Sequence, residues 1–294
     1  PMTAAALPVA QDSRTRAPAF GQLGAMALVF GGIGLFALLL WAIGAGEFGN
    51  PKGMGGGHAA SPSLEGYGAL ADLLEARGNT VTLGREQSDL RSNGLVILTP
   101  PHDADGDVVA ELLEQRAWRG PTILVLPKWL SQPAPDKEGW TILMDSFDPQ
   151  WAGTLAPVGP GSLATCGGSC APSRRFEGLG LTGALPAEGP VRTLAGPELI
   201  PVVRTPGTGA LAALVDNGGI DADGLRRLGL DPASAQPYSG GRYPLLVVAE
   251  PDLLNNRGLA DMPSARAAVR LIEAVGGANR PIVMDVTLNG LGRG

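Results

Sequence analysis

The most regular hydrophobic pattern in the chain is a long apolar stretch near its start. The 30 residues between Arg16 and Glu47 carry no ionisable side chain. Apolar side chains and glycine fill nearly every position from Leu23 to Ile43, and no polar face recurs at helical spacing. About 20 apolar residues, each rising about 1.5 Å, span the roughly 30 Å hydrocarbon core of a bilayer. The pattern therefore predicts a membrane-spanning helix over residues 20–45.

Two other interpretations of this segment remain open. A cleaved signal peptide also carries basic residues before its apolar core, and it could end at the small residues Gly44, Ala45 and Gly46. Such a core is normally about 7–15 residues long, which is shorter than this one. A buried helix of a soluble domain is the third interpretation. The length of the segment favours an uncleaved anchor.

Basic residues flank the apolar segment unevenly. Arg14 and Arg16 lie just before it, whereas one acidic and one basic residue lie just after it. An excess of positive charge on one side places that side in the cytoplasm, here residues 1–19. We therefore expect the rest of the chain to lie in the periplasm, joined to the anchor by a flexible linker over residues 46–62.

From residue 63 onward, short apolar strands alternate with amphipathic helices. Ser61 or Ser63 can cap the first helix, and Gly78 suits the left-handed conformation that ends many helices. Strands buried on both faces and separated by helices are typical of a mostly parallel sheet. We expect residues 63–294 to form a doubly wound, Rossmann-like α/β domain. The predicted strands are residues 80–83, 95–99, 122–126, 245–249 and 282–286, and the predicted helices are residues 63–77, 107–118 and 264–275.

The alternation breaks between about residues 129 and 241. Many of the 44 glycines and 26 prolines of the chain fall in this stretch. Only three short strand candidates occur within it, at residues 140–144, 200–203 and 211–215. We expect a long insertion of irregular or hairpin structure that packs against the edge of the sheet.

The insertion contains the two cysteines of the chain, Cys166 and Cys170, within the motif TCGGSC. In an oxidising compartment, two cysteines joined by flexible glycines are expected to form a disulfide. The closed loop is small, so the stabilisation lies at the low end of about 2–4 kcal/mol. A free or redox-active pair and a metal site are the alternatives, although two thiolates do not complete a tetrahedral zinc shell.

Charge and composition exclude some classes of partner. The net charge is −6, and lysine and arginine form no cluster outside the first 16 residues. These features argue against binding to nucleic acid. The glycine-rich run at residues 53–57 does not follow a strand, so it is not a phosphate-binding loop. We expect no cofactor.

Polar residues collect directly after the predicted strands. The carboxyl ends of parallel strands meet at one edge of a sheet, and ligands bind there in open α/β folds. This edge is therefore predicted to form a small polar pocket or a surface that recognises a partner. The alternative is that these residues only cap helices and build turns, as Asp103 and Asp252 could do. The candidate binding residues are His102, Asp103, Lys128, Asp252, Asn255, Asn256 and Asp285.

Catalytic motifs are not visible at this edge. A nucleophilic enzyme needs an activated serine or cysteine at a strand-to-helix turn with a base nearby. The turn after residues 122–126 instead carries Pro127 and Lys128. A metal site could use His102 with Asp103 or Asp105, but the spacing matches no known cluster. We therefore expect neither catalytic nor metal-binding residues.

The order of these features resembles one membrane-protein family. An apolar anchor is followed by LVILTPPHDADGDVVAELLEQRAWRGPTILVLPK and later by PDLLNNRGL and IVMDVTLNG. This order is similar to the domain of unknown function 4350 family, over residues 61–128 and 243–289. The resemblance implies a fold like that of class I glutamine amidotransferases. It also implies a second membrane helix after the domain, and partnership with a MoxR-type ATPase and other membrane proteins.

One departure from amidotransferases bears on function. A working amidotransferase needs a cysteine at the turn after a central strand, and this chain has Lys128 there. The resemblance therefore implies the fold without that chemistry. We expect a non-catalytic binding or assembly module of the cell envelope. The alternative is a periplasmic hydrolase or transferase whose unrecognised site uses His102, Asp103, Lys128 and Asp252.

Overall fold

The computed structural model describes two compact units separately. They comprise Pro1–Pro51 and Lys52–Gly294. The described residues are 22–44, 55–137, 141–155, 158, 162–166, 174–207, 209–277 and 280–293. The predicted disulfide involves Cys170, which lies outside these residues, so the pairing stays a prediction.

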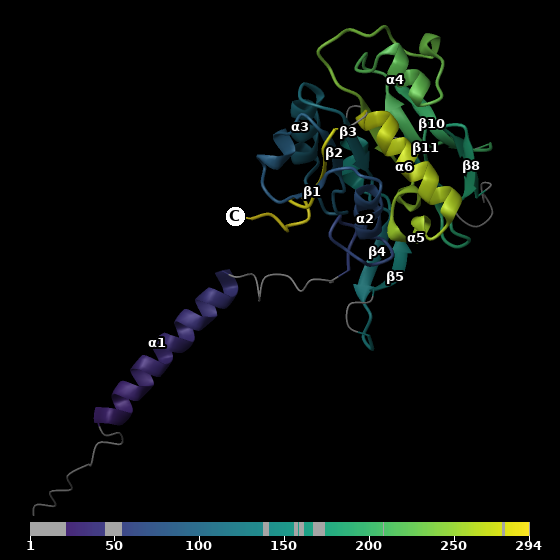
Figure 1. Ribbon diagram of the computed structural model, residues 1–294. Coiled ribbons are helices and arrows are strands. Elements are labelled where there is room, and N and C mark those ends of the chain that lie inside the picture. Colours follow the sequence, from purple (N-terminus) through teal and green to yellow (C-terminus); the bar gives the residue numbers. More distant parts are fainter. Residues whose placement is uncertain are drawn as a thin grey trace, which may run out of the picture. The chain divides into compact units, whose positions relative to one another are not determined.

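The described residues of the first unit form the helix α1 (Gln22–Gly44), in the segment where the sequence predicts one (Figure 1). The large apolar side chains described along it are exposed, and they include Met26, Leu28, Phe30, Ile33, Leu35 and Phe36. No helix in the described part of the chain is both long and apolar enough to cross a membrane. The membrane anchor therefore stays a prediction.

The second unit is an α/β domain built on an eleven-stranded sheet. Five neighbouring strands are parallel, and each lies within one residue of a strand predicted above. Their order across the sheet is β1 (Val81–Gly84), β13 (Ile282–Asp285), β2 (Leu95–Leu98), β3 (Thr122–Val125) and β12 (Leu245–Val248). The predicted strands of the domain are thus confirmed, and they form one continuous parallel half.

The insertion forms the other half of the sheet. Its hairpins agree with one of the two expectations for this stretch, whereas the expectation of a mostly parallel sheet is corrected. Its strands pair antiparallel beyond β12, so the whole sheet is mixed. The candidates at 200–203 and 211–215 are confirmed as strands. The strands are β11 (Gly209–Val215), β10 (Leu199–Thr205), β7 (Arg175–Gly178), β8 (Leu181–Ala184), β9 (Val191–Leu194) and β6 (Leu163–Cys166).

A tight turn explains why two neighbouring strands of the insertion run antiparallel. β7 and β8 are joined by Leu179 and Gly180 alone, whose φ angles are 57° and 69°. Positive φ at both central residues matches the right-handed twist of a two-residue hairpin. A separate hairpin joins β4 (Trp129–Pro133) to β5 (Thr141–Ser146), where the third strand candidate was predicted.

Helices cover both faces of the sheet. On one face, α2 (Gly68–Ala76) and α6 (Met262–Gly276) pack on a core that includes Leu70, Leu271 and Ile97. On the other face, α3 (Gly106–Ala117) packs through Val109 and Leu113. The remaining helical segments are short: α4 (Ala222–Arg227), α5 (Asn256–Leu259), η1 (Asp89–Arg91), η2 (Gln150–Thr154), η4 (Pro232–Ser234) and η5 (Pro251–Leu253).

The first predicted helix of the domain begins later than expected. Tyr67 precedes α2 and makes no side-chain cap, whereas Ser61 and Ser63 bond to each other at 2.8 Å. The chain turns back on itself here, because the Gly68 amide donates to the Ser61 carbonyl at 3.1 Å. Gly78 has a φ of 88° at the end of α2, as predicted.

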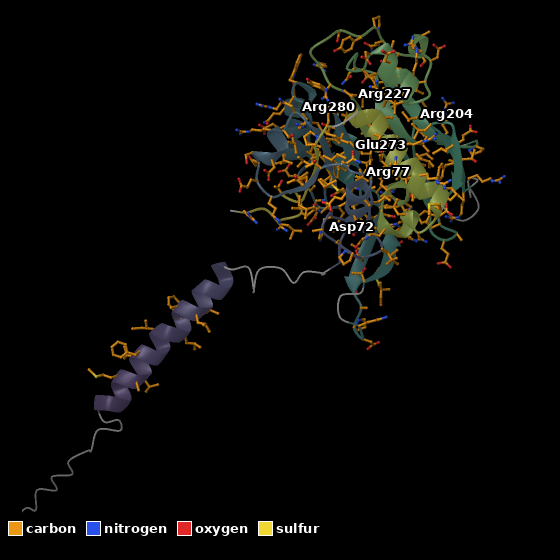
Figure 2. The ribbon with its side chains drawn as sticks, in the orientation of Figure 1. Asp72, Arg77, Arg204, Arg227, Glu273 and Arg280 are labelled. Carbon is orange, nitrogen blue, oxygen red and sulfur yellow. The ribbon has the colours of Figure 1, made fainter. Side chains whose placement is uncertain are left out.

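Two arginines attach α2 and α3 to their surroundings. At the end of α2, Arg77 pairs with Glu273 of α6 at 3.5 Å (Figure 2). In α3, Arg116 is 1% exposed and donates to backbone carbonyls that include Gly94 at 2.8 Å and Pro121 at 3.2 Å. Burial, with a smaller effect of Arg119, lowers the pKa of Arg116 to about 10. This cation therefore binds loops of the fold together.

Candidate functional site

A cavity of about 590 Å³ opens at the carboxyl ends of the parallel strands. Its walls include Thr99 after β2, Lys128 after β3, Asn255 after β12 and Asn289 after β13. Small-molecule sites usually measure about 300–1,000 Å³ and occur at this edge of α/β sheets. A cavity of suitable size therefore lies where the sequence predicts a pocket.

Four of the seven candidate binding residues line the cavity: His102, Asp103, Lys128 and Asn255. The His102 side chain is 50% exposed and stacks edge-on against Phe147, with ring centroids 5.0 Å apart. The Asp103 side chain is 76% exposed. Both lie at the cavity mouth in contact with solvent, so neither is held in one geometry by burial.

Lys128 lies at the floor of the cavity, with a side chain only 1% exposed. Its ammonium donates to Asp252 Oδ2 at 2.8 Å, to the Pro190 carbonyl at 3.1 Å and to Glu250 Oε1. An ammonium group has three N–H donors, so these contacts use all of them. Lys128 therefore retains no donor for a ligand.

Asp252 lies behind Lys128 and does not line the cavity. Its carboxylate accepts from Trp129 Nε1 at 2.8 Å, from Asn255 Nδ2 at 2.7 Å and from Arg257 at 3.0 Å. Burial alone would raise its pKa, but Lys128, Trp129 and Asn255 together hold the pKa of Asp252 below its usual value. The carboxylate is thus ionised and fully engaged within the protein.

Glu250 completes this buried charge cluster. It accepts from Lys128, from the Arg192 amide at 2.9 Å and from the Asp252 amide at 3.1 Å. Burial raises the pKa of Glu250, and Lys128 opposes that rise. Buried charges persist when they are paired and hydrogen-bonded, as they are here. The cluster joins the ends of β3 and β12.

The side chains of Asn255 and Asn256, in the loop that follows β12, form hydrogen bonds within the fold. Asn255 Oδ1 accepts from the Gly258 amide at 3.0 Å and caps α5. Asn256 donates to the carbonyls of Ser61 at 3.0 Å and Ser63 at 2.6 Å, and it accepts from the Ala69 amide at 2.9 Å. These bonds give Asn256 the role of a clamp between two chain segments. It does not line the cavity.

Asp285 ends β13 and is fully buried. Its carboxylate accepts from the amide and the hydroxyl of Thr287, at 2.8 Å and 2.7 Å, and from the Leu288 amide at 3.3 Å. Burial raises the pKa of Asp285, and these donors lower it by less. Asp285 shapes the turn that carries Asn289 to the cavity, and it does not line the cavity itself.

The lining also includes residues that were not predicted from the sequence, among them Glu65, Tyr67, Thr99 and Ser131. Glu65 is 5% exposed and accepts from the Ser131 hydroxyl. Burial raises the pKa of Glu65, and this hydrogen bond opposes the rise. Thr99 directly follows β2, so its position at a strand end was the available signal. The position of Glu65 depends on the turn before α2, where the sequence pattern predicts a helix.

Two buried oxygen atoms in the cavity wall have no partner among the described residues. They are Thr99 Oγ1 and Asn289 Oδ1. Thr99 is 2% exposed, and Asn289 Nδ2 donates to the Thr99 carbonyl at 3.1 Å. Most buried polar atoms in proteins are hydrogen-bonded to protein or to ordered water, so these two oxygens mark a place where a water molecule or a ligand group can bind.

No protein-family model, curated protein or solved structure matches this chain. The resemblance to the domain of unknown function 4350 family therefore stays a prediction.

Proposed function

We propose that this chain is a membrane-anchored, non-catalytic binding module whose α/β domain holds a small polar ligand in the strand-end cavity. The observation that carries the proposal is the pair of unpartnered oxygens, Thr99 Oγ1 and Asn289 Oδ1, in the wall of a cavity of about 590 Å³. An unsatisfied buried polar group costs about 1–3 kcal/mol, which a ligand hydrogen bond would recover.

The state of Lys128 supports a role without nucleophilic chemistry at this position. In a glutamine amidotransferase-like fold, the turn after the central strand carries the nucleophile. Here that turn carries Lys128, whose three donors bond to Glu250, Asp252 and Pro190. All three N–H donors of Lys128 are therefore engaged within the fold, and none is directed at a substrate.

We also propose a more specific fold class and a cellular location for this chain, both from patterns in its sequence. Five parallel strands with helices on both faces are compatible with a doubly wound, Rossmann-like or glutamine amidotransferase-like domain. The uncharged apolar segment supports an inner-membrane anchor with residues 63–294 in the periplasm. The family resemblance supports partners among membrane and periplasmic proteins, including a MoxR-type ATPase.

A hydrolase or transferase is the second candidate function. The observation that favours it is the hydrogen bond from the Ser131 hydroxyl to Glu65, a carboxylate whose pKa burial raises. A serine bonded to a base is one part of a nucleophilic site. The described residues offer no third group that orients Glu65, so we rank this function below binding.

Two measurements on the purified full-length chain separate these functions. Saturation-transfer NMR with a library of small polar compounds tests binding, and wild type is expected to give hits that Thr99→Val weakens. Assays with generic ester, amide and phosphate substrates test turnover, and none is expected. Turnover that Ser131→Ala abolishes would establish the enzyme instead. The binding proposal would be overturned if no compound of the library binds. It would also be overturned if Thr99→Val leaves the binding of every hit unchanged.

The proposed topology has its own test. A reporter that is active only in the periplasm, fused after Gly294, should be active if residues 1–19 are cytoplasmic. Activity of a cytoplasmic reporter at the same junction would contradict the orientation.

A further inference from the structure

Glu65 is a nearly buried carboxyl group without a cationic partner. It lines the cavity, is 5% exposed and bonds to the neutral hydroxyl of Ser131. Within the described residues, no lysine or arginine forms a salt bridge with it. Buried carboxylates in proteins are normally paired with a cation or neutralised by a proton. In the protein alone a proton fills this role, and a cationic ligand in the cavity can take the place of that proton.

The rest of the cavity wall does not favour an anion. Among the described residues, Lys128 is the one lysine or arginine in the lining, and its three donors are already engaged. Asp103 adds negative charge at the mouth. Burial first, and then the charges of Asp252, Glu65 and Glu250, raise the pKa of Tyr67 well above its usual value. A lining hydroxyl therefore experiences a negative potential, which attracts cations.

Uncharged hydrogen-bonding groups accompany Glu65. Thr99 Oγ1 and Asn289 Oδ1 are buried and lack partners in the described part of the domain. The amide oxygen accepts only, whereas the hydroxyl both donates and accepts. A ligand hydroxyl group can satisfy both atoms, because it also donates and accepts. These two atoms are independent of the charge on Glu65, so they specify a second chemical feature of the ligand.

We infer that the cavity binds a small organic ammonium ion that carries hydroxyl groups, such as an amino sugar, with its ammonium paired to Glu65 and a hydroxyl bonded to Thr99 and Asn289. The inference rests on the proposed function, which makes this cavity a binding site. A volume of about 590 Å³ accommodates a monosaccharide-sized molecule.

Calorimetric titration of the full-length chain tests the inference with glucosamine, glucose and inorganic phosphate. At about pH 6.5 the sugar amine is protonated. Glucosamine is expected to bind at least about tenfold more tightly than glucose, because it gains a buried ion pair. Phosphate is expected not to bind.

Two carboxylate variants locate the ion pair. Glu65→Gln retains an acceptor for Ser131 but removes the charge, so it should abolish the preference for glucosamine. Glu86→Gln is the matched control, because it removes an exposed carboxylate outside the cavity that also accepts from a serine hydroxyl, and it should change the affinity by less than about threefold. Thr99→Val should weaken glucosamine and glucose to similar extents. Thermal melts of each variant establish that it is folded.

The outcomes distinguish the inference from the proposed function. Equal affinity for glucosamine and glucose, tighter binding of phosphate, or an unchanged preference in Glu65→Gln would overturn the inference and leave a binding site of another class. If none of the three compounds binds, the amino-sugar inference also fails. The proposed function itself fails if the wider NMR library yields no ligand that depends on Thr99, or if the chain shows turnover that Ser131→Ala abolishes.

Discussion

The Lys128 ammonium lies 2.8 Å from the Asp252 carboxylate, which comes 124 positions later in the chain. This contact joins the loop after β3 to the loop after β12 at the floor of the cavity. Glu250 accepts a second hydrogen bond from the same ammonium. Lys128, at the position where the resemblance to amidotransferases led us to look for a nucleophile, thus connects two loops of the site.

Removing this lysine should severely destabilise the domain. Lys128→Met leaves Glu250 buried without a cation and Asp252 paired with Arg257 alone, and breaking a buried pair in this way costs about 3–5 kcal/mol. Urea denaturation followed by circular dichroism measures the loss. The double variant Lys128→Met, Asp252→Asn carries one buried charge fewer, so it should recover part of that loss. A Lys128→Met protein as stable as wild type would contradict the assignment of these three residues to one charge cluster.

Asn256 should behave as a structural residue. Asn256→Ala removes the partner of two carbonyls and one amide, so we expect a loss of about 1–3 kcal/mol in the free energy of unfolding. Asn93, which is exposed and has no described side-chain hydrogen bond, is the control, and Asn93→Ala should cost no more than about 0.5 kcal/mol. Unchanged stability in Asn256→Ala would show that the clamp between the loop after β12 and the start of the domain is unimportant.

Glu65→Gln should stabilise the fold in a pH-dependent manner. Burial raises the pKa of Glu65, so the folded state holds the proton more tightly than the unfolded state. Its stabilising contribution is complete below the unfolded pKa, about 4.3, and is lost as the pH rises through the folded pKa. Glutamine never ionises, so the variant should melt above wild type at about pH 8, with a difference that shrinks toward about pH 4.

An exposed glutamate provides the control for this pH dependence. Glu86 also accepts from a serine hydroxyl, Ser88 at 3.2 Å, but it is exposed. Melting temperatures of Glu86→Gln should therefore follow those of wild type across the same pH range. A Glu65→Gln protein less stable than wild type at about pH 8 would mean that the charge of Glu65 stabilises the fold. That result would contradict the inference that this carboxylate lacks a partner until a ligand binds.

The parallel half of the sheet could be predicted because its strands are short runs of buried apolar residues. β2, β3 and β13 are buried along their whole length, and this signal is local. Strands β7 and β8 of the insertion are equally short, but most of their side chains are exposed or half-buried, so they lack this apolar signal. Their pairing depends on the hairpin turn at Leu179 and Gly180, where a leucine adopts the unusual positive φ. Such a turn is not apparent from composition.

The location of the site could be predicted from the sequence, but several of the residues that line it could not. Strand ends placed Lys128 and Asn255 at the cavity, as parallel topology requires. The contacts of Asn256 could not be foreseen, because its partner Ser61 lies 195 positions earlier in the chain. Glu65 was missed because Ser61 and Ser63 bond to each other and to nearby backbone groups, which keeps the segment before α2 from being helical.

The most direct test of the site compares two buried threonines of the same sheet region. Thr99 and Thr122 are each 2% exposed. The Thr122 hydroxyl accepts from Arg116 and donates to the Gly120 carbonyl, both at 3.3 Å, whereas the Thr99 hydroxyl has no partner among the described residues. Valine has nearly the same shape as threonine, so each Thr→Val variant removes little besides the hydroxyl.

Urea denaturation of the ligand-free protein gives the free energy of unfolding for each variant. Thr122→Val should lose about 1–3 kcal/mol, because it leaves bonded groups unsatisfied. Thr99→Val should be as stable as wild type or more stable, because the fold makes no use of that hydroxyl. A Thr99→Val protein destabilised as much as Thr122→Val would contradict the account, since the hydroxyl would then serve the fold and leave the cavity without its best evidence for a ligand.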